Sequence, residues 1–124
     1  MPAVAILSAA HVHTPGFIRN LKETGDGRRL HSIWDDDKAR GRQAAADAAV
    51  PFVEDLEELL ADRTVDAFAI CAENSHHLDL LRVTLPLRKP VFCEKPLVVS
   101  GEELATLEAL QRETDTSLMT GYFL

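Results

Sequence analysis

Short apolar runs alternate along the chain with longer stretches in which apolar residues recur every three or four positions. Runs rich in Val, Ile, Phe and Ala are typical of buried strands, and the longer period is typical of helices that cover them. The alternation predicts an α/β fold with about six parallel strands in the doubly wound order 3-2-1-4-5-6. The expected strands are 3–9, 30–34, 51–53, 65–72, 90–93 and 117–124.

Capping residues and helix breakers place helices between these strands. Asp37 is expected to cap a helix over 38–49, and Ser100 with Glu103 has the spacing of a capping box for the last helix. The other helices are expected from Thr14 to near Gly25 and over 54–61 and 75–87. A single Rossmann-type domain over residues 1–124 follows, and the edge strand at 51–53 is its weakest member.

Composition narrows the classes of function. With 46% hydrophobic and 27% charged residues the chain has the composition of a water-soluble globular protein. Its formal charge of -7 argues against nucleic acid as a partner, because that binding needs clustered Lys and Arg. The apolar start of the chain is too short to span a bilayer, so no membrane partner and a cytoplasmic location are expected. Two cysteines, Cys71 and Cys93, are expected to be reduced strand residues.

The loops that follow the strands are where a ligand is expected, because an open parallel sheet binds ligands at the carboxyl ends of its strands. The first of these loops lacks the glycines of the G-x-G-x-x-G fingerprint. Ser8, Ala10 and His13 stand at its three glycine positions. The following helix still offers free N–H groups and a dipole that favour a phosphate.

Asp35 ends the second predicted strand about 20 residues beyond that loop, where a carboxylate accepts hydrogen bonds from an adenosine ribose. This spacing favours NAD as the cofactor over NADP. The alternative is that Asp35, Asp36 and Asp37 form only a solvated turn and helix cap.

The segment KPVFCEKPLVVSGEEL, residues 89–104, resembles the most distinctive motif of the Gfo/Idh/MocA family of glucose-fructose oxidoreductases and inositol dehydrogenases. The family's T-P-x-x-x-H loop resembles Cys71 to His77, with Ala72 in place of the proline. The resemblance runs from the first strand to the last and implies an NAD-dependent oxidoreductase. It would transfer a hydride between the nicotinamide cofactor and a small hydroxylated compound such as a sugar or polyol.

The resemblance also implies residue roles. Lys95 would contact the nicotinamide ribose and the substrate hydroxyl, where an amine can help remove the hydroxyl proton. His77 is the second catalytic candidate and, with Asn74, would line the cofactor groove, while Glu94 and Pro96 would shape the turn. The full set of expected cofactor-binding residues is Ser8, Ala10, His11, His13, Asp35, Asp36, Cys71, Ala72, Asn74, His77, Glu94, Lys95 and Pro96.

Two departures from the family pattern leave alternatives open. Family members carry a second α/β domain for the substrate, so this chain alone is expected to be inactive. Family members also usually associate through that domain, so any homo-oligomer of this chain would form through another surface. The altered first loop also fits a ligand sensor or scaffold without redox activity. A third alternative is a metal-dependent hydrolase that uses His11 and His13, although two ligands make an incomplete zinc site and no metal is expected.

Overall fold

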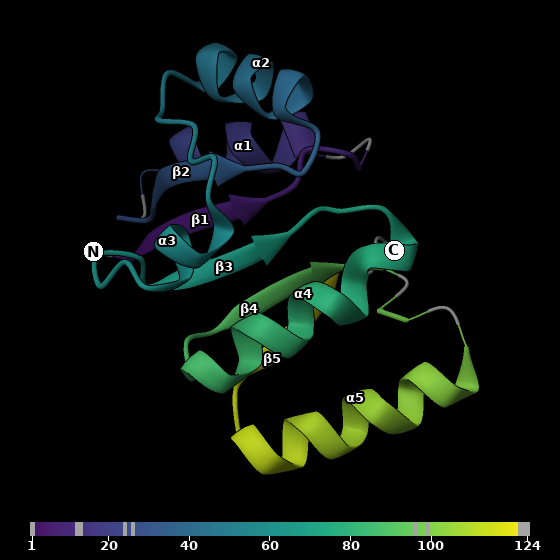
Figure 1. Ribbon diagram of the computed structural model, residues 1–124. Helices are drawn as coiled ribbons and strands as arrows, with labels where there is room; N and C mark the ends of the chain where they lie inside the picture. Colours follow the sequence, from purple (N-terminus) through teal and green to yellow (C-terminus); the bar gives the residue numbers. More distant parts are fainter. Residues whose placement is uncertain are drawn as a thin grey trace.

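Five parallel strands form one sheet in the order β2-β1-β3-β4-β5 (Figure 1). The structure is a computed structural model that describes residues 2–11, 14–23, 25, 27–95, 97–98 and 100–121. The strands are β1 (Ala3–Leu7), β2 (Arg29–Trp34), β3 (Ala67–Ile70), β4 (Val91–Glu94) and β5 (Leu118–Gly121). All five residues of β1 are buried, as expected for a central strand with both faces covered.

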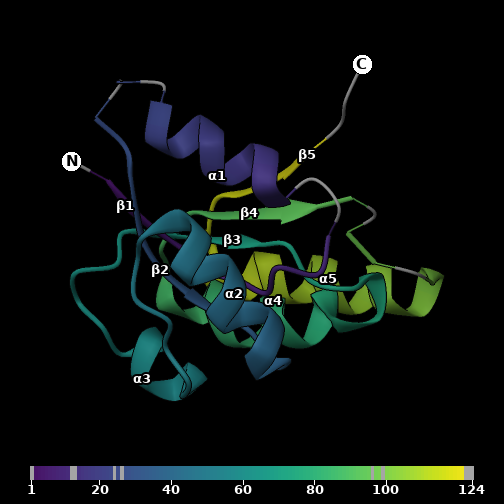
Figure 2. The same ribbon diagram turned by 90° about the horizontal axis from the view of Figure 1, so that it is seen from above.

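Helices cover both faces of the sheet (Figure 2). The helices α1 (Thr14–Glu23) and α2 (Lys38–Ala48) lie on one face. The helices α3 (Leu56–Leu60), α4 (His77–Thr84) and α5 (Gly101–Thr114) lie on the other, with the short 3₁₀ turns η1 (Asn74–His76) and η2 (Leu85–Leu87) at the two ends of α4. Each face has its own apolar core, one around Ile6 and Ile33 and one around Phe68 and Leu81. The predicted doubly wound fold is confirmed.

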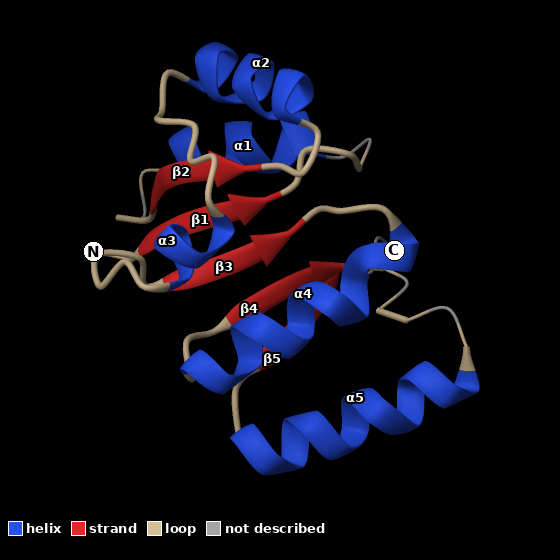
Figure 3. Cartoon of the chain, viewed as in Figure 1, coloured by secondary structure: helices blue, strands red, loops and turns tan. Residues whose placement is uncertain are grey.

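The predicted strand at 51–53 is reduced to a single bridge. Phe52 pairs in parallel with Ile33, on the outer side of β2 where the prediction placed that strand. The Ile33 N–H donates to the Pro51 carbonyl and the Val53 N–H donates to the Ile33 carbonyl. Pro51 has no N–H to extend the ladder, and Asp55 already caps α3, so the pairing stops after one bridge. The sheet therefore has five strands in the expected order (Figure 3).

The predicted caps of two helices are confirmed. The Asp37 side chain accepts a hydrogen bond from the Arg40 N–H at the start of α2. The Ser100 hydroxyl accepts one from the Glu103 N–H at the start of α5. Thr14, by contrast, is the first residue of α1, and its hydroxyl donates to the His11 carbonyl.

Among the described residues, no helix combines the length and apolar character needed to cross a membrane.

The strand order reverses between β1 and β3. The loop after β1 leads to α1 on one face of the sheet, and the loop after β3 leads to α4 on the other (Figure 2). Two neighbouring strands whose connections diverge in this way leave a crevice at their carboxyl ends, where ligands of open α/β sheets bind.

Candidate functional site

The loops that the sequence singles out lie at one edge of the sheet. Asp35 follows β2 and Lys95 follows β4, and both strands run in the same direction, so both residues lie at the carboxyl edge. The loop after β1 is tied to both of its neighbours. The Ser8 N–H donates to the Trp34 carbonyl at 2.6 Å, and the His11 N–H donates to the Cys71 carbonyl at 2.9 Å.

Ser8 makes the tight turn that glycine makes in the fingerprint. Its φ of 75° lies in the left-handed region, where the backbone of any residue other than glycine is strained. The buried Ser8 hydroxyl accepts a hydrogen bond from the Ala10 N–H at 3.2 Å and thereby stabilises the turn. The first loop therefore keeps the turn although it lacks the glycine.

The Asp35 carboxylate is buried and holds three segments together. One oxygen accepts from the Ala9 N–H at 3.0 Å and from Arg40 Nε at 2.8 Å. The other accepts from the Asp37 N–H at 3.0 Å and from Arg40 Nη2 at 2.7 Å. Asp35 thus ties the first loop to the start of α2, and Arg40 covers it.

This arrangement sets the charges of the pair. Burial opposes ionisation of Asp35, but the hydrogen bonds from Arg40 and from the backbone outweigh it and hold the pKa of the carboxyl below its usual range. The same bond to Asp35 raises the pKa of Arg40. Asp35 and Arg40 therefore form a charged pair at neutral pH.

A pocket of about 230 Å³ opens beside Asp35 at the carboxyl ends of β1, β2 and β3. Its lining residues are Ser8, Trp34, Asp36, Ala72, His76, Asp79 and Leu80. A drug-sized ligand fills a larger space, so this pocket suits one part of a dinucleotide rather than the whole.

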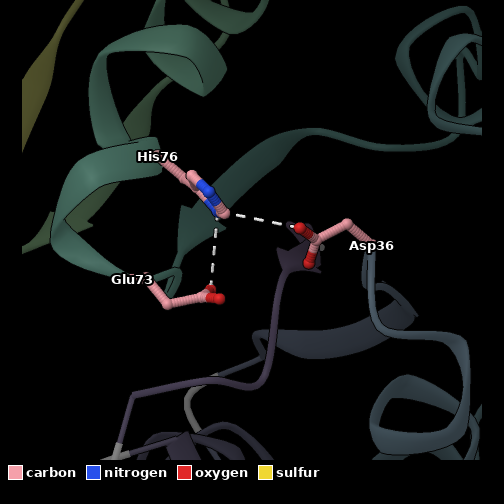
Figure 4. Close-up of side chains that lie close together, drawn as sticks. All are labelled: Asp36, Glu73 and His76. Atoms are coloured by element: carbon pink, nitrogen blue, oxygen red, sulfur yellow. Dashed lines mark ion pairs between the residues drawn. The ribbon is translucent and has the colours of Figure 1, made fainter.

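Asp36 and His76, which both line this pocket, lie close to Glu73 (Figure 4). His76 Nδ1 lies 3.7 Å from an oxygen of Asp36 and 3.7 Å from an oxygen of Glu73. Arg40 Nη2 lies 3.4 Å from Asp36 and 3.5 Å from Glu73. Burial and the neighbouring Asp35 and Glu73 raise the pKa of Asp36. The possible ligand atoms of Asp36, Glu73 and His76 lie within 4.8 Å of one another, and the Arg40 guanidinium competes with a metal ion for the two carboxylates.

The E-K-P segment ends β4 with a buried acid. Glu94 is 2% exposed, and its Oε2 has no hydrogen-bond partner among the described residues. His11 Nε2 is 3.8 Å from that oxygen. Lys95, the next residue, is exposed at the carboxyl edge.

Burial, with the charge of Glu94, raises the pKa of the Cys71 thiol to about 12, so Cys71 stays protonated.

His77 and Asn74 are placed differently from one another. The His77 ring is fully buried, and its Nε2 lies 3.0 Å from the Ala72 carbonyl, so this contact stabilises the loop after β3. Asn74 is exposed at the start of η1, and Ala10 is partly exposed in the first loop. His13 and Pro96 lie outside the described residues.

The structure adds residues that the sequence reasoning missed. Arg40, Glu73 and His76 were not among the expected site residues, yet His76 lines the pocket beside Trp34, and Glu73 forms ion pairs with both His76 and Arg40. Two signals were available. Arg40 lies in the first turn of the helix that Asp37 caps, close enough in sequence to reach back to Asp35. The T-P-x-x-x-H spacing, counted from Cys71, places its histidine at His76 and not at His77. A second and larger groove, about 720 Å³, lies between α1 and α2 and has Arg40 at its rim.

Comparison with known proteins agrees with this geometry. Residues 4–122 match the family model described as an oxidoreductase family with an NAD-binding Rossmann fold, GFO_IDH_MocA. The chain is 33% identical over 94 residues to inositol 2-dehydrogenase 1 of Saccharopolyspora erythraea, covering 74% of this chain and 28% of that protein. It is 31% identical over 104 residues to myo-inositol 2-dehydrogenase of Thermotoga maritima, covering 83% of this chain and 31% of that protein.

Solved structures give the same result. A probable dehydrogenase from Thermotoga maritima superposes with a TM-score of 0.84 at 27% identity, covering 96% of this chain and 35% of that one. GenD2 from gentamicin A biosynthesis, solved in complex with NAD, superposes with a TM-score of 0.83 at 26% identity, covering 97% and 34%. The chain thus spans about a third of the length of the relatives it matches.

Proposed function

Because the chain belongs to the Gfo/Idh/MocA oxidoreductase family and has its NAD-binding Rossmann fold, we propose that it supplies the cofactor half of a polyol or sugar dehydrogenase. In this proposal NAD lies across the carboxyl edge of the sheet. Its adenosine end meets the pocket beside Trp34, and its nicotinamide end meets Lys95. Lys95 assists the transfer of a hydride from a secondary alcohol.

The observation that carries the proposal is the arrangement of the carboxyl edge. The strand-order reversal between β1 and β3 lies at the pocket beside Trp34, and the exposed Lys95 follows β4, the next strand along the same edge. The α1 helix begins at the same edge, where its free N–H groups suit a pyrophosphate. Recognition groups for the adenosine, the phosphates and the reacting end therefore follow one another along a single edge.

The chemistry requires a proton acceptor as well as a hydride acceptor. NAD supplies the hydride acceptor when it is bound. When the C–H electron pair of a secondary alcohol leaves as hydride, the hydroxyl proton must also leave so that a neutral ketone forms. The amine of Lys95 is the group proposed to receive that proton. Glu94, directly before it, is buried and pairs with Gly121 of β5 at the end of β4.

The substrate class rests on the relatives. The two relatives compared above by sequence are inositol dehydrogenases, which act on a cyclic polyol, and they match this chain over most of its length. The rest of their length supports the proposal that substrate contacts come from a further domain. A ligand sensor built on the same fold is the second candidate, and the missing glycines of the first loop favour it.

A domain exchange tests the proposal. Residues 4–121 of this chain would replace the corresponding segment of the Thermotoga maritima myo-inositol 2-dehydrogenase, which is 31% identical to it. We expect the hybrid to form NADH from NAD and myo-inositol. Lys95→Met should lower kcat by a factor of roughly 100 to 10,000, the usual contribution of a positioned acid or base.

The matched control is Arg112→Met, which removes an exposed cation from the last turn of α5, at the opposite edge of the sheet. It should leave kcat unchanged. NADH binding is measured in each protein, so that loss of the fold is not mistaken for loss of chemistry. A hybrid that binds NADH tightly but keeps its kcat in Lys95→Met would refute the role of Lys95. A hybrid that binds NADH without any turnover would favour the sensor.

A further inference from the structure

Glu94 is a buried acid with an incomplete set of contacts. It is 2% exposed, and its Oε2 has no hydrogen-bond partner among the described residues. Burying an ionised carboxylate is costly unless a positive charge lies beside it. A cation next to Glu94 would therefore stabilise the folded chain.

The groups around this carboxylate come from neighbouring segments. Cys93 precedes it in β4, Cys71 follows β3, and His11 lies in the loop after β1. Burial and, to a lesser extent, the charge of Glu94 raise the pKa of both thiols, so neither thiol is charged at neutral pH. β5 brings Gly121, which has no side chain, beside Glu94. The imidazole of His11 is the group in this set that can carry a positive charge.

His11 is placed to reach the buried oxygen. Its Nε2 lies 3.8 Å from Glu94 Oε2, and its side chain is 18% exposed. That distance exceeds a hydrogen bond by about 1 Å, which a small rotation of either side chain closes. The backbone of His11 is held on both sides, because its N–H donates to the Cys71 carbonyl and its carbonyl accepts from the Thr14 N–H and hydroxyl. The pair can therefore close without a movement of the loop.

Resting on the NAD site proposed above, we propose that protonated His11 pairs with Glu94 and acts as a positioning residue for the nicotinamide end of that site. The end of β4, which carries Lys95, is thereby held against the loop that leads into α1. An imidazole ordinarily loses its proton near about pH 6.5, so the pair strengthens the site at lower pH and is lost as the pH rises.

A second histidine gives a matched comparison near the amino edge of the sheet. The side chain of His31 in β2 is 16% exposed, and its Nε2 lies 3.6 Å from an oxygen of Asp62 and 2.8 Å from Thr64 Oγ1. The Asp62 side chain is itself 36% exposed, so water already stabilises its charge and the pair contributes little. Glu94 has almost no access to water, so its coupling to His11 is expected to be the stronger one.

The test measures NADH binding to the purified 124-residue chain through the emission of Trp34, which lines the pocket. His11→Gln keeps a polar side chain that cannot carry a charge. We expect it to weaken NADH binding about tenfold at pH 6 and less than about twofold at pH 9. Adenosine fills only the pocket beside Trp34 and should keep its affinity. The ratio of the two dissociation constants therefore separates the pair from the titration of His76 in that pocket.

Two further variants distinguish positioning from a general loss of structure. His11→Lys keeps a cation at both pH values and should bind NADH as tightly at pH 9 as at pH 6. A merely structural role of the imidazole would leave this variant weak at both. His31→Gln is the matched control and should leave the NADH dissociation constant unchanged.

Thermal denaturation tests the pair without any nucleotide. At pH 6, His11→Gln should lower the Tm by about 4 °C. In a Glu94→Gln background the same substitution should lower it no further, because the charge that His11 faces is gone.

The outcomes separate the pair from the NAD site. Equal effects of His11→Gln at pH 6 and pH 9, or additive losses of Tm in the double variant, would overturn the pairing of His11 with Glu94. Coupled losses of Tm with unchanged NADH binding would overturn the positioning role. A wild-type chain that binds NADH at neither pH would contradict the proposed function and the positioning role together, while the Tm values still decide whether the pair exists.

Discussion

The contact between Asp35 and Arg40 is the one on which the carboxyl edge depends most. Asp35 is the only described carboxylate that receives two backbone N–H groups from different loops together with two bonds from one guanidinium. Replacing Asp35 by Asn would leave the Arg40 guanidinium, which is about one-third exposed, without its main partner. The free energy of unfolding at neutral pH should fall by about 2–4 kcal/mol.

The pH dependence of that loss has a definite sign. The folded-state pKa of Asp35 lies below its ordinary value of 3.8, so the pair stabilises the protein fully above that value. Its contribution disappears as the pH falls through the lower, folded-state pKa. Thermal denaturation of wild type and Asp35→Asn from about pH 7 down to about pH 2 should therefore show a constant gap that closes only at the acidic end. A gap that persists at the acidic end would show that shape, and not charge, is lost.

The positions of some site residues could be predicted from the sequence, whereas their contacts could not. The position of Asp35 at the end of β2, the caps at Asp37 and Ser100, and Lys95 at the carboxyl edge all follow from local spacing. That Arg40 saturates Asp35 does not follow, because it depends on the angle at which α2 meets β2. The contact of Asp36 with His76 is also invisible locally, since it needs the loops of two strands that are not consecutive in the chain.

At the scale of elements, the approach of α2 to β2 depends on Gly41. A methyl group at Gly41 would overlap the Phe52 ring and lie 2.6 Å from Asp35 Cβ. Helix propensity alone would favour alanine there by about 1 kcal/mol. The crowding should win, since Asp35 is held by four hydrogen bonds and Phe52 by its bridge to Ile33.

Gly41→Ala should therefore destabilise the chain by about 1–3 kcal/mol in urea denaturation. Gly16→Ala is the matched control, because Gly16 lies in α1 and a methyl group added there would meet no atom within 4 Å apart from its chain neighbours and the backbone of its own helix. That control should stabilise the chain by about 0.5 kcal/mol. If both substitutions stabilised equally, α2 would not pack against β2 as closely as the structure shows.

The presence and order of the strands were predicted correctly, but the length of the edge strand was not. Five of the six expected strands form, because their apolar runs are long enough to be buried between two layers of helices. The segment at 51–53 lies beside β2 as expected, but Pro51 and the Asp55 cap leave it room for only one bridge. Strand lengths at an edge depend on such neighbours more than on the apolar run itself.

At the scale of the whole molecule, the carboxyl edge is one continuous site only if its two ends bind one ligand together. The pocket at Trp34 belongs to β1, β2 and β3, while Glu94 and Lys95 belong to β4. NAD is long enough to reach both, whereas AMP offers only the adenosine and one phosphate. Binding to the folded state alone raises stability by mass action, so the two ligands give different thermal shifts.

NADH at one hundred times its dissociation constant should stabilise the fold by about 2.7 kcal/mol. For a domain of this length that corresponds to a rise in Tm of about 10 °C. AMP at the same concentration should raise Tm by much less, because it leaves the β4 end empty. Differential scanning fluorimetry of the purified chain measures both shifts. Equal shifts from NADH and AMP would mean that the β4 end contributes nothing to binding, and the edge would then hold an adenosine site separate from Lys95.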